Sequence, residues 1–167
     1  NMGEIPIIAE DLGIITQDVV DLREEFSFPG MRVLQFGFGS GAENPFLPHN
    51  YIPNCIAFTG THDNDTARGW FEHISQNEKE FCLRYLNSKS SDIAWNMIRA
   101  VWASCANVAI APMQDFLNLG SSARMNFPGV SQGNWIWRVP QDGFAEELCQ
   151  QIKSLNHTYG RVRSNSS

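Results

Sequence analysis

The order in which strand-like and helical segments alternate is the feature of this sequence that most restricts its fold. Apolar runs of strand length, some with polar ends, occupy residues 5–10, 31–39, 55–63 and 108–115. Segments with the character of helices occupy residues 16–26, 77–86, 91–107 and 145–155. Buried strands that alternate with helices are typical of a parallel sheet covered by helices. The sequence therefore predicts an α/β fold built on a parallel sheet.

Acidic residues stand where three of these strands end. The stretch "IIAEDLG" places Glu10 and Asp11 directly after apolar residues, "FTGTHDNDT" carries Asp63 and Asp65, and the last strand ends at Asp115. Active sites of α/β folds are built at the carboxyl ends of strands, where two carboxylates can divide the roles of glycosidic chemistry. A single acid at such a position could equally cap a helix. Several together favour a catalytic pocket.

Other side chains near these acids allow more than one interpretation. His62 beside Asp63 could be a metal ligand, but one such pair without further ligands is a weak signal, and we expect no metal. No phosphate-binding or dinucleotide motif occurs, and we expect no cofactor. Phe36 and Trp135 could support sugar rings, although aromatic residues more often belong to the core. Asn126 could bond sugar hydroxyls or simply stabilise a turn.

Composition excludes several classes of partner and compartment. A net charge of −6 argues against nucleic acid, which normally binds a basic face. No apolar run is long enough to span a membrane, and the first residues do not resemble a signal peptide. The four cysteines form no C-x-x-C pair, so we expect small buried side chains in a reducing compartment, the cytoplasm.

Five motifs together resemble the 4-α-glucanotransferases of glycoside hydrolase family 77, the amylomaltases or disproportionating enzymes. They are "IIAEDLG", "PGMRVLQFGFGSGAENPFLPHNY", "TGTHDNDTARGW", "APMQDFLNLGSSARMNFPG" and "GNWIWR", and they follow in order over most of the chain. The second motif is most similar to the plant and cyanobacterial branch, which would place the protein in the plastid stroma if it comes from a plant or alga. Gly39 and Ser40 stand where other bacterial members often carry acids, so acceptor contacts from such acids are not expected.

The resemblance implies a fold, a reaction and roles for individual residues. It predicts the C-terminal part of a (β/α)8 barrel over residues 1–160, followed by a polar tail at 161–167. The reaction would be retaining transfer of an α-1,4-glucan segment, from maltooligosaccharides or starch-derived dextrins, to the 4-hydroxyl of an acceptor. Glu10 would be the acid/base, Asp63 would stabilise the transition state, and His62 would bond a sugar hydroxyl. Three further residues would line the glucan path: Asn126, Asp11 and Phe36.

The nucleophile is the point at which residues and resemblance disagree. From the residues alone, Asp63 could be the nucleophile that partners Glu10. The family carries its nucleophile on an earlier strand, in an Arg-x-Asp-His-Phe context that this sequence lacks. Following the resemblance, we expect the nucleophile to lie upstream of this sequence and the isolated chain to be inactive. Two alternatives are a carbohydrate-binding remnant that lost its nucleophile and a structural half-barrel without a ligand.

Overall fold

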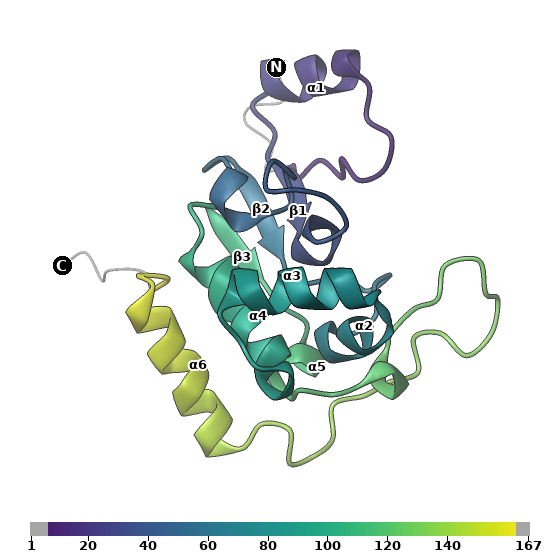
Figure 1. Ribbon diagram of the computed structural model, residues 1–167, viewed down its shortest axis with the longest axis vertical. Helices are drawn as coiled ribbons and strands as arrows, with labels where there is room; N and C mark the ends of the chain where they lie inside the picture. The colour runs from purple at the N-terminus through teal and green to yellow at the C-terminus, as the bar shows by residue number, and fades with distance from the viewer. Residues whose placement is uncertain (1–6, 163–167) are drawn as a thin grey trace.

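A three-stranded parallel sheet forms the centre of the fold in the computed structural model, which describes residues 7–162 (Figure 1). Its strands are β1 (Gly30–Val33), β2 (Cys55–Phe58) and β3 (Val108–Ile110), in the order β1-β2-β3. The register pairs Val33 with Phe58 and Phe58 with Ile110, so the carboxyl ends of the three strands meet at one edge. The predicted parallel α/β architecture is confirmed for these strands.

Helices connect the strands and follow the last one. The α-helices are α1 (Gln17–Glu25), α2 (Ala67–His73), α3 (Gln76–Leu86), α4 (Ile93–Ala103), α5 (Met113–Phe116) and α6 (Glu146–Thr158). Short 3₁₀ helices are η1 (Leu34–Gly37), η2 (Pro48–Asn50), η3 (Ser90–Asp92) and η4 (Ser121–Ala123). Ser75 starts α3 with a capping box, because its hydroxyl accepts from the Glu78 amide while the Glu78 carboxylate accepts from the Ser75 amide.

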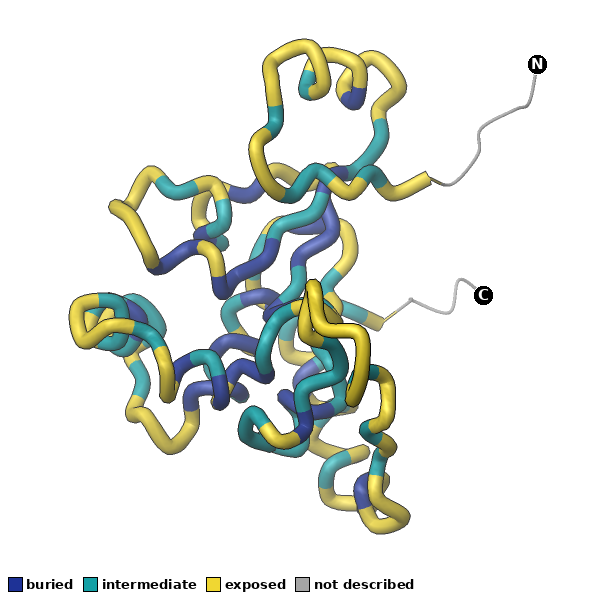
Figure 2. The backbone as a smooth tube through the Cα atoms, turned by 90° about the vertical axis from the view of Figure 1, so that its right-hand side faces the viewer, coloured by how far each residue is buried: buried dark blue, intermediate teal, exposed yellow. Residues whose placement is uncertain are grey.

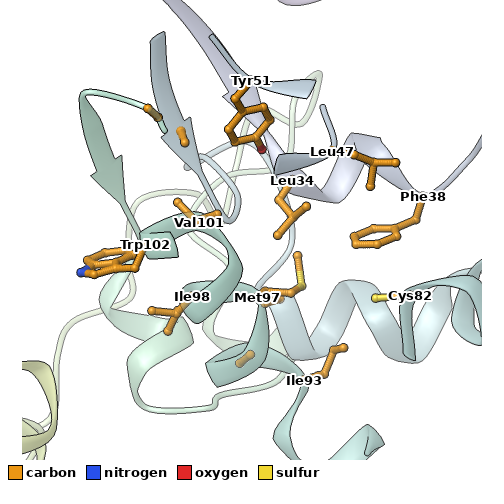
Figure 3. Packing of buried hydrophobic residues seen from close by; sticks show 14 of the residues in the cluster. Leu34, Phe38, Leu47, Tyr51, Cys82, Ile93, Met97, Ile98, Val101 and Trp102 are labelled. Atoms are coloured by element: carbon orange, nitrogen blue, oxygen red, sulfur yellow. The ribbon is translucent and has the colours of Figure 1, made fainter. Parts of the chain in front are cut away.

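Helix α4 forms the middle of the hydrophobic core. It contacts α2, α3, α5, α6 and β3, and its buried face consists of Ile93, Ala94, Met97, Ile98, Val101 and Trp102. Figure 3 shows the larger of these side chains, those of Ile93, Met97, Ile98, Val101 and Trp102, in one cluster with Leu34, Phe38, Leu47 and Tyr51, which come from η1 and the long loop after it. A helix with apolar residues on most of its surface must be covered by several neighbours, and α4 is covered in this way.

The segment before β1 differs from the prediction. Residues 5 and 6 lie outside the described residues, and residues 7–10 form no strand, so the predicted strand is wrong for that part. Their link to the sheet is a backbone hydrogen bond from Ala9 to the Pro29 carbonyl, and Ile7 and Ile8 are 41% and 53% exposed. A strand needs a run of ladder bonds, and one bond at the start of β1 does not provide it. Helix α1 follows as an exposed arm (Figure 2).

Three further elements depart from the expected boundaries. The apolar run at 31–39 is strand only as far as Val33 and then coils into η1. The run at 108–115 turns into α5 after a three-residue strand. Helix α2 was not expected, because it has seven residues and includes Gly69, a poor helix former. Its N-terminal signal is Thr66, whose hydroxyl accepts a hydrogen bond from the Gly69 amide.

Arg161, near the end of the described residues, packs against the end of α4. Arg161 donates hydrogen bonds to the carbonyls of Trp102, Ser104 and Ala106, where α4 ends. Two of the four cysteines, Cys55 and Cys82, are buried as expected, whereas Cys105 and Cys149 are exposed, in the turn after α4 and on the outer face of α6. Within residues 7–162, no helix combines the length and apolar character that crossing a membrane requires.

Candidate active site

The loop between β2 and α2, residues 59–66, carries two of the predicted site residues. We call it the β2–α2 loop. Its turn is fixed by Asn64, whose side-chain oxygen accepts 2.8 Å hydrogen bonds from both the amide and the hydroxyl of Thr61. The Asn64 amide returns a bond to the Thr61 carbonyl. His62 and Asp63 therefore lie at the tip of a tight turn beyond the end of β2, with both side chains about half exposed.

Asp63 is held on one side of its carboxylate. Its Oδ1 accepts a 2.6 Å hydrogen bond from the Asn126 side-chain amide and lies 3.3 Å from His62 Nε2. No hydrogen bond to Oδ2 is found among residues 7–162, so this oxygen can accept one from a ligand. The structure thus brings three predicted residues together: His62, Asp63 and Asn126.

Glu10 and Asp63 line the same cavity, which has a volume of about 210 Å³. The cavity lies at the carboxyl ends of β2 and β3, between the segment that carries Glu10 and the β2–α2 loop. Its lining residues are Glu10, Leu12, Met31, Phe58, Gly60, Thr61, His62, Asp63, Ile110 and Pro112. Glu10 is exposed, and in the described part of the chain its carboxylate has no hydrogen-bond partner. The predicted acid/base and the predicted transition-state stabiliser therefore face one space.

Asp11 points away from this cavity into an ion-pair cluster. Its Oδ1 accepts from the Met31 amide at 2.6 Å, and its Oδ2 lies 3.1 Å from Arg23 Nη1 and 3.3 Å from Arg32 Nη1. The Asp11 side chain is only 9% exposed, and the side chains of both arginines are also mostly buried. This geometry favours an anchoring role: Asp11 fastens its segment to β1 and so places the neighbouring Glu10.

The other acids at strand ends are also held within the protein. Asp65 accepts from the Ser121 hydroxyl at 2.6 Å and from the Thr66 amide. Asp115 is 1% exposed and accepts from the Thr59 hydroxyl and the Ala67 amide. Burial raises the pKa of Asp115 to about 6, and the two hydrogen bonds oppose that rise. Both acids therefore have a structural role, since their carboxylates accept hydrogen bonds from donors around the start of α2.

Phe36 does not reach the cavity that Glu10 and Asp63 share. It lies on η1, is 43% exposed and packs edge-on against Phe46, with ring centroids 5.5 Å apart. Its exposed ring leaves the predicted contact with a longer ligand open. Asn126 does not line that cavity either, and its side chain contacts Asp63 instead.

Two residues of the loop after η4 lie beside His62 and Asp63: Arg124, which was not predicted as a site residue, and Trp135, which was considered only as a support for a sugar ring. Arg124 donates a 2.6 Å hydrogen bond to the Asp63 carbonyl. Trp135 packs against His62 with ring centroids 5.0 Å apart, and its backbone φ of 63° is unusual for a bulky residue. Both line a second cavity of about 180 Å³ behind His62. The motifs "ARMNFPG" and "GNWIWR" contain these residues, but no sequence pattern predicts that the two stretches fold back onto His62.

A metal site was not expected, and the described residues hold no cluster for one. Within residues 7–162, no three side chains of His, Cys, Asp or Glu are placed so that they could hold one ion.

Comparisons with known proteins agree on one family. A family model described as 4-alpha-glucanotransferase, of glycoside hydrolase family 77, matches residues 1–142. A 4-alpha-glucanotransferase from Clostridium butyricum is 49% identical over 96% of this chain, and a chloroplastic/amyloplastic one from Solanum tuberosum is 51% identical over 96%. These two values do not separate the plant from the bacterial relatives.

A solved structure gives the same result for the fold. An amylomaltase from Streptococcus agalactiae, in complex with acarbose, matches 97% of this chain with a TM-score of 0.93 and 34% identity. This match confirms the expected fold class, an α/β portion of a (β/α)8 barrel. The chain covers 33% of that structure and 33% and 29% of the two relatives named above, so it spans about a third of their length. By family model, sequence and fold, the chain belongs to glycoside hydrolase family 77, the 4-alpha-glucanotransferases.

Proposed function

We propose that this chain is part of a 4-α-glucanotransferase that moves α-1,4-glucan segments between chains by a retaining double displacement. The observation that carries the proposal is the cavity that Glu10 and Asp63 share in a member of this family. The names of the relatives support the activity, and the acarbose complex of the amylomaltase from Streptococcus agalactiae supports a carbohydrate ligand. Because the chain spans about a third of its relatives, the activity is proposed for the longer protein that contains it, here called the complete enzyme.

Glu10 is proposed as the general acid and base. A retaining mechanism needs a carboxyl group that gives a proton to the leaving sugar and later takes one from the acceptor hydroxyl. Such a group must be free of strong partners within the protein and open to the substrate. Glu10 meets both conditions within the described residues, since its exposed carboxylate lines the cavity.

Asp63 is proposed as the carboxylate that stabilises the oxocarbenium-like transition state. Asn126 and His62 hold its Oδ1, while Oδ2 is available to sugar hydroxyls. A carboxylate fixed on one side presents the other in a constant direction, and such preorganisation is what transition-state stabilisation requires. His62, beside it in the same cavity, would bond a neighbouring hydroxyl, and Asn126 and Phe36 would border the glucan path.

The attacking nucleophile is proposed to lie outside this sequence. In a retaining enzyme the two catalytic carboxyl groups stand about 5 Å apart, and one of them attacks the anomeric carbon. Asp63 engages Asn126 and His62 through Oδ1, which suits a stabilising role. We further propose that the complete enzyme acts on soluble maltooligosaccharides or dextrins, in the cytoplasm or in a plastid stroma, without nucleic-acid or membrane partners.

Disproportionation of maltotriose tests this proposal. The complete enzyme should release glucose and form longer glucans, and Glu10→Gln should abolish most of that activity. Glu147→Gln is a matched control, because Glu147 is an exposed glutamate on α6 outside the cavity. Binding of maltotriose by calorimetry without any transfer, in the wild-type enzyme, would instead favour a carbohydrate-binding remnant.

A further inference from the structure

Arg124 connects two segments that are far apart in the sequence but meet beside Asp63. Its Nη2 donates a 2.6 Å hydrogen bond to the Asp63 carbonyl, 61 residues away, and its Nε donates a 2.9 Å bond to the Asn126 carbonyl. One guanidinium therefore binds the backbone of the β2–α2 loop and the backbone of the loop after η4.

The guanidinium is also held on its face. Its Cζ lies 4.3 Å from the centroid of the Phe127 ring, within the range of a cation–π contact. Two directed hydrogen bonds and one stacking contact fix a planar group in position and orientation. A lysine could not reproduce this arrangement, because its single ammonium lacks both the fork and the flat face.

The contact that Arg124 supports is the one that orients the Asp63 carboxylate. The Asn126 amide donates to the His62 carbonyl at 3.1 Å, and the Asn126 side chain donates to Asp63 Oδ1 at 2.6 Å. These bonds require the Asn126 backbone to stay close to the β2–α2 loop. Arg124 bonds both partners of this pair from the other side.

Arg124 itself lies outside the cavity that Glu10 and Asp63 share. It lines the second cavity, behind His62, together with Trp135. A side chain in that place supports the site without facing the space in which a substrate would react.

We propose that Arg124 is a positioning residue for the transferase reaction: it keeps Asn126 and Asp63 in register and so fixes the direction of the Asp63 carboxylate. This inference rests on the proposed function of Asp63. Because Arg124 acts on the transition state through Asp63, its loss should lower kcat more than it raises KM. Misplacement of a catalytic group by about 1 Å can cost about 100-fold in rate, which sets the expected scale.

The first test compares arginine variants of the complete enzyme with maltotriose as substrate. Arg124→Ala should lower kcat about 10- to 100-fold and change KM less than about threefold. Arg124→Lys should fall between the wild type and Arg124→Ala, since one ammonium can bond one of the two carbonyls. Arg68→Ala is a matched control on α2, where Arg68 pairs with Glu72 on the surface, and it should keep wild-type kcat. A rise in KM with unchanged kcat in Arg124→Ala would overturn the proposal.

The second test is a double-variant cycle with Asp63→Asn. If Arg124 acts through Asp63, adding Arg124→Ala to Asp63→Asn should lower kcat by less than about threefold beyond the loss in Asp63→Asn alone, because the effects of interacting residues are not additive. Losses that multiply in full would show that Arg124 acts independently of Asp63 and would overturn the proposal. Should Arg124→Ala fail to fold, Arg124→Lys takes its place in the cycle with the same two outcomes. Wild-type activity in Asp63→Asn alone would refute the proposed role of Asp63, a failure distinct from that of Arg124.

Discussion

The carboxylate of Asp115 accepts a 2.6 Å hydrogen bond from the hydroxyl of Thr59, at the point where β2 ends. Its other oxygen accepts a 2.7 Å bond from the Ala67 amide, at the first residue of α2. One buried carboxylate thus joins the two ends of the β2–α2 loop. This loop carries His62 and Asp63. Asp115 therefore fixes the distance between its two ends, while Arg124 binds the backbone at its tip.

Asp115 should make the stability of the fold depend on pH. Burial raises its pKa from 3.8 to about 6. The folded state therefore binds a proton more tightly than the unfolded state, and the contribution of this group to the free energy of unfolding falls as pH rises from about 4 to 6. The full change is on the order of 3 kcal/mol. Asp115→Asn removes this dependence.

Thermal unfolding of the complete enzyme at several pH values measures the effect. The Tm of Asp115→Asn minus that of the wild type should increase as pH rises from about 4 to 6. Above pH 6 this difference should stay constant. Asp142→Asn, at an exposed position before α6, is a matched control. A difference between wild type and Asp115→Asn that is constant from pH 4 to 7 would show that the carboxyl has an ordinary pKa.

Gly30 should tolerate no side chain, because the ion pair between Asp11 and Arg23 occupies the space where a Cβ would lie. Gly30→Ala would push the two groups apart, and breaking a buried ion pair costs about 3–5 kcal/mol. Gly120→Ala is the matched control, since its Cβ would meet no atom within 4 Å and its φ of −83° suits any residue. Denaturation of the complete enzyme should show a lower Tm for Gly30→Ala alone. Equal Tm values would mean that Asp11 anchors its segment less firmly than the contacts indicate.

The isolated chain should show no transferase activity, although it carries Glu10 and Asp63. The proposed nucleophile is not encoded in it, and without a covalent intermediate the retaining reaction does not proceed. Purified chain is incubated with maltotriose, and glucose and longer glucans are followed by chromatography. Sustained disproportionation would contradict the prediction and would restore Asp63 as a candidate nucleophile.

The isolated chain should also self-associate, because it leaves apolar side chains uncovered at the edge of the sheet. Val108 and Ile110 on the edge strand β3 are 41% and 40% exposed. An open, apolar sheet edge readily pairs with another chain. Light scattering after size exclusion should show species larger than 18.8 kDa, and Val108→Lys should reduce them. Val130→Lys, at an exposed loop residue away from the sheet, should have no such effect. A monomer with a sharp thermal transition would refute this expectation.

Sequence patterns predicted the sheet and the longer helices. They did not predict features that depend on individual side-chain contacts, such as which acids are buried. Helix α4 followed from its apolar spacing, and the parallel sheet followed from the alternation of strand-like runs with helical segments; α1, α3 and α6 were also predicted. The convergence of Glu10 and Asp63 was predicted from the rule that carboxyl ends of parallel strands meet, but residues 7–10 form no strand, and Glu10 reaches the cavity because its segment is bonded to the start of β1. The sequence alone did not distinguish the acids that line the cavity, Glu10 and Asp63, from those that are buried. Asp11 is buried because arginines from α1 and β1 reach it, and Asp115 is buried because Thr59 and Ala67 do.

The proposed roles of Glu10 and Asp63 predict different responses to the leaving group of the donor. Glu10→Gln keeps the size of the side chain but removes its proton, which should lower turnover of maltotriose by about 10²–10⁴-fold in the complete enzyme. An α-glucosyl fluoride needs no protonation of its leaving group, so formation of the glycosyl-enzyme from it should be largely unaffected. Single-turnover release of fluoride measures this first step directly.

Asp63→Asn should instead slow the first step with both donors. Stabilisation of the oxocarbenium-like state is needed whatever leaves, and an amide at this position lacks the negative charge that provides it. The same substitution would also weaken the contact of Oδ1 with Asn126 if the amide turned its nitrogen toward that side chain. The ratio of the two donors' rates therefore separates the residues: Glu10→Gln should raise the preference for fluoride, and Asp63→Asn should leave it unchanged. If Glu10→Gln slows fluoride release as much as maltotriose turnover, the acid/base assignment is wrong.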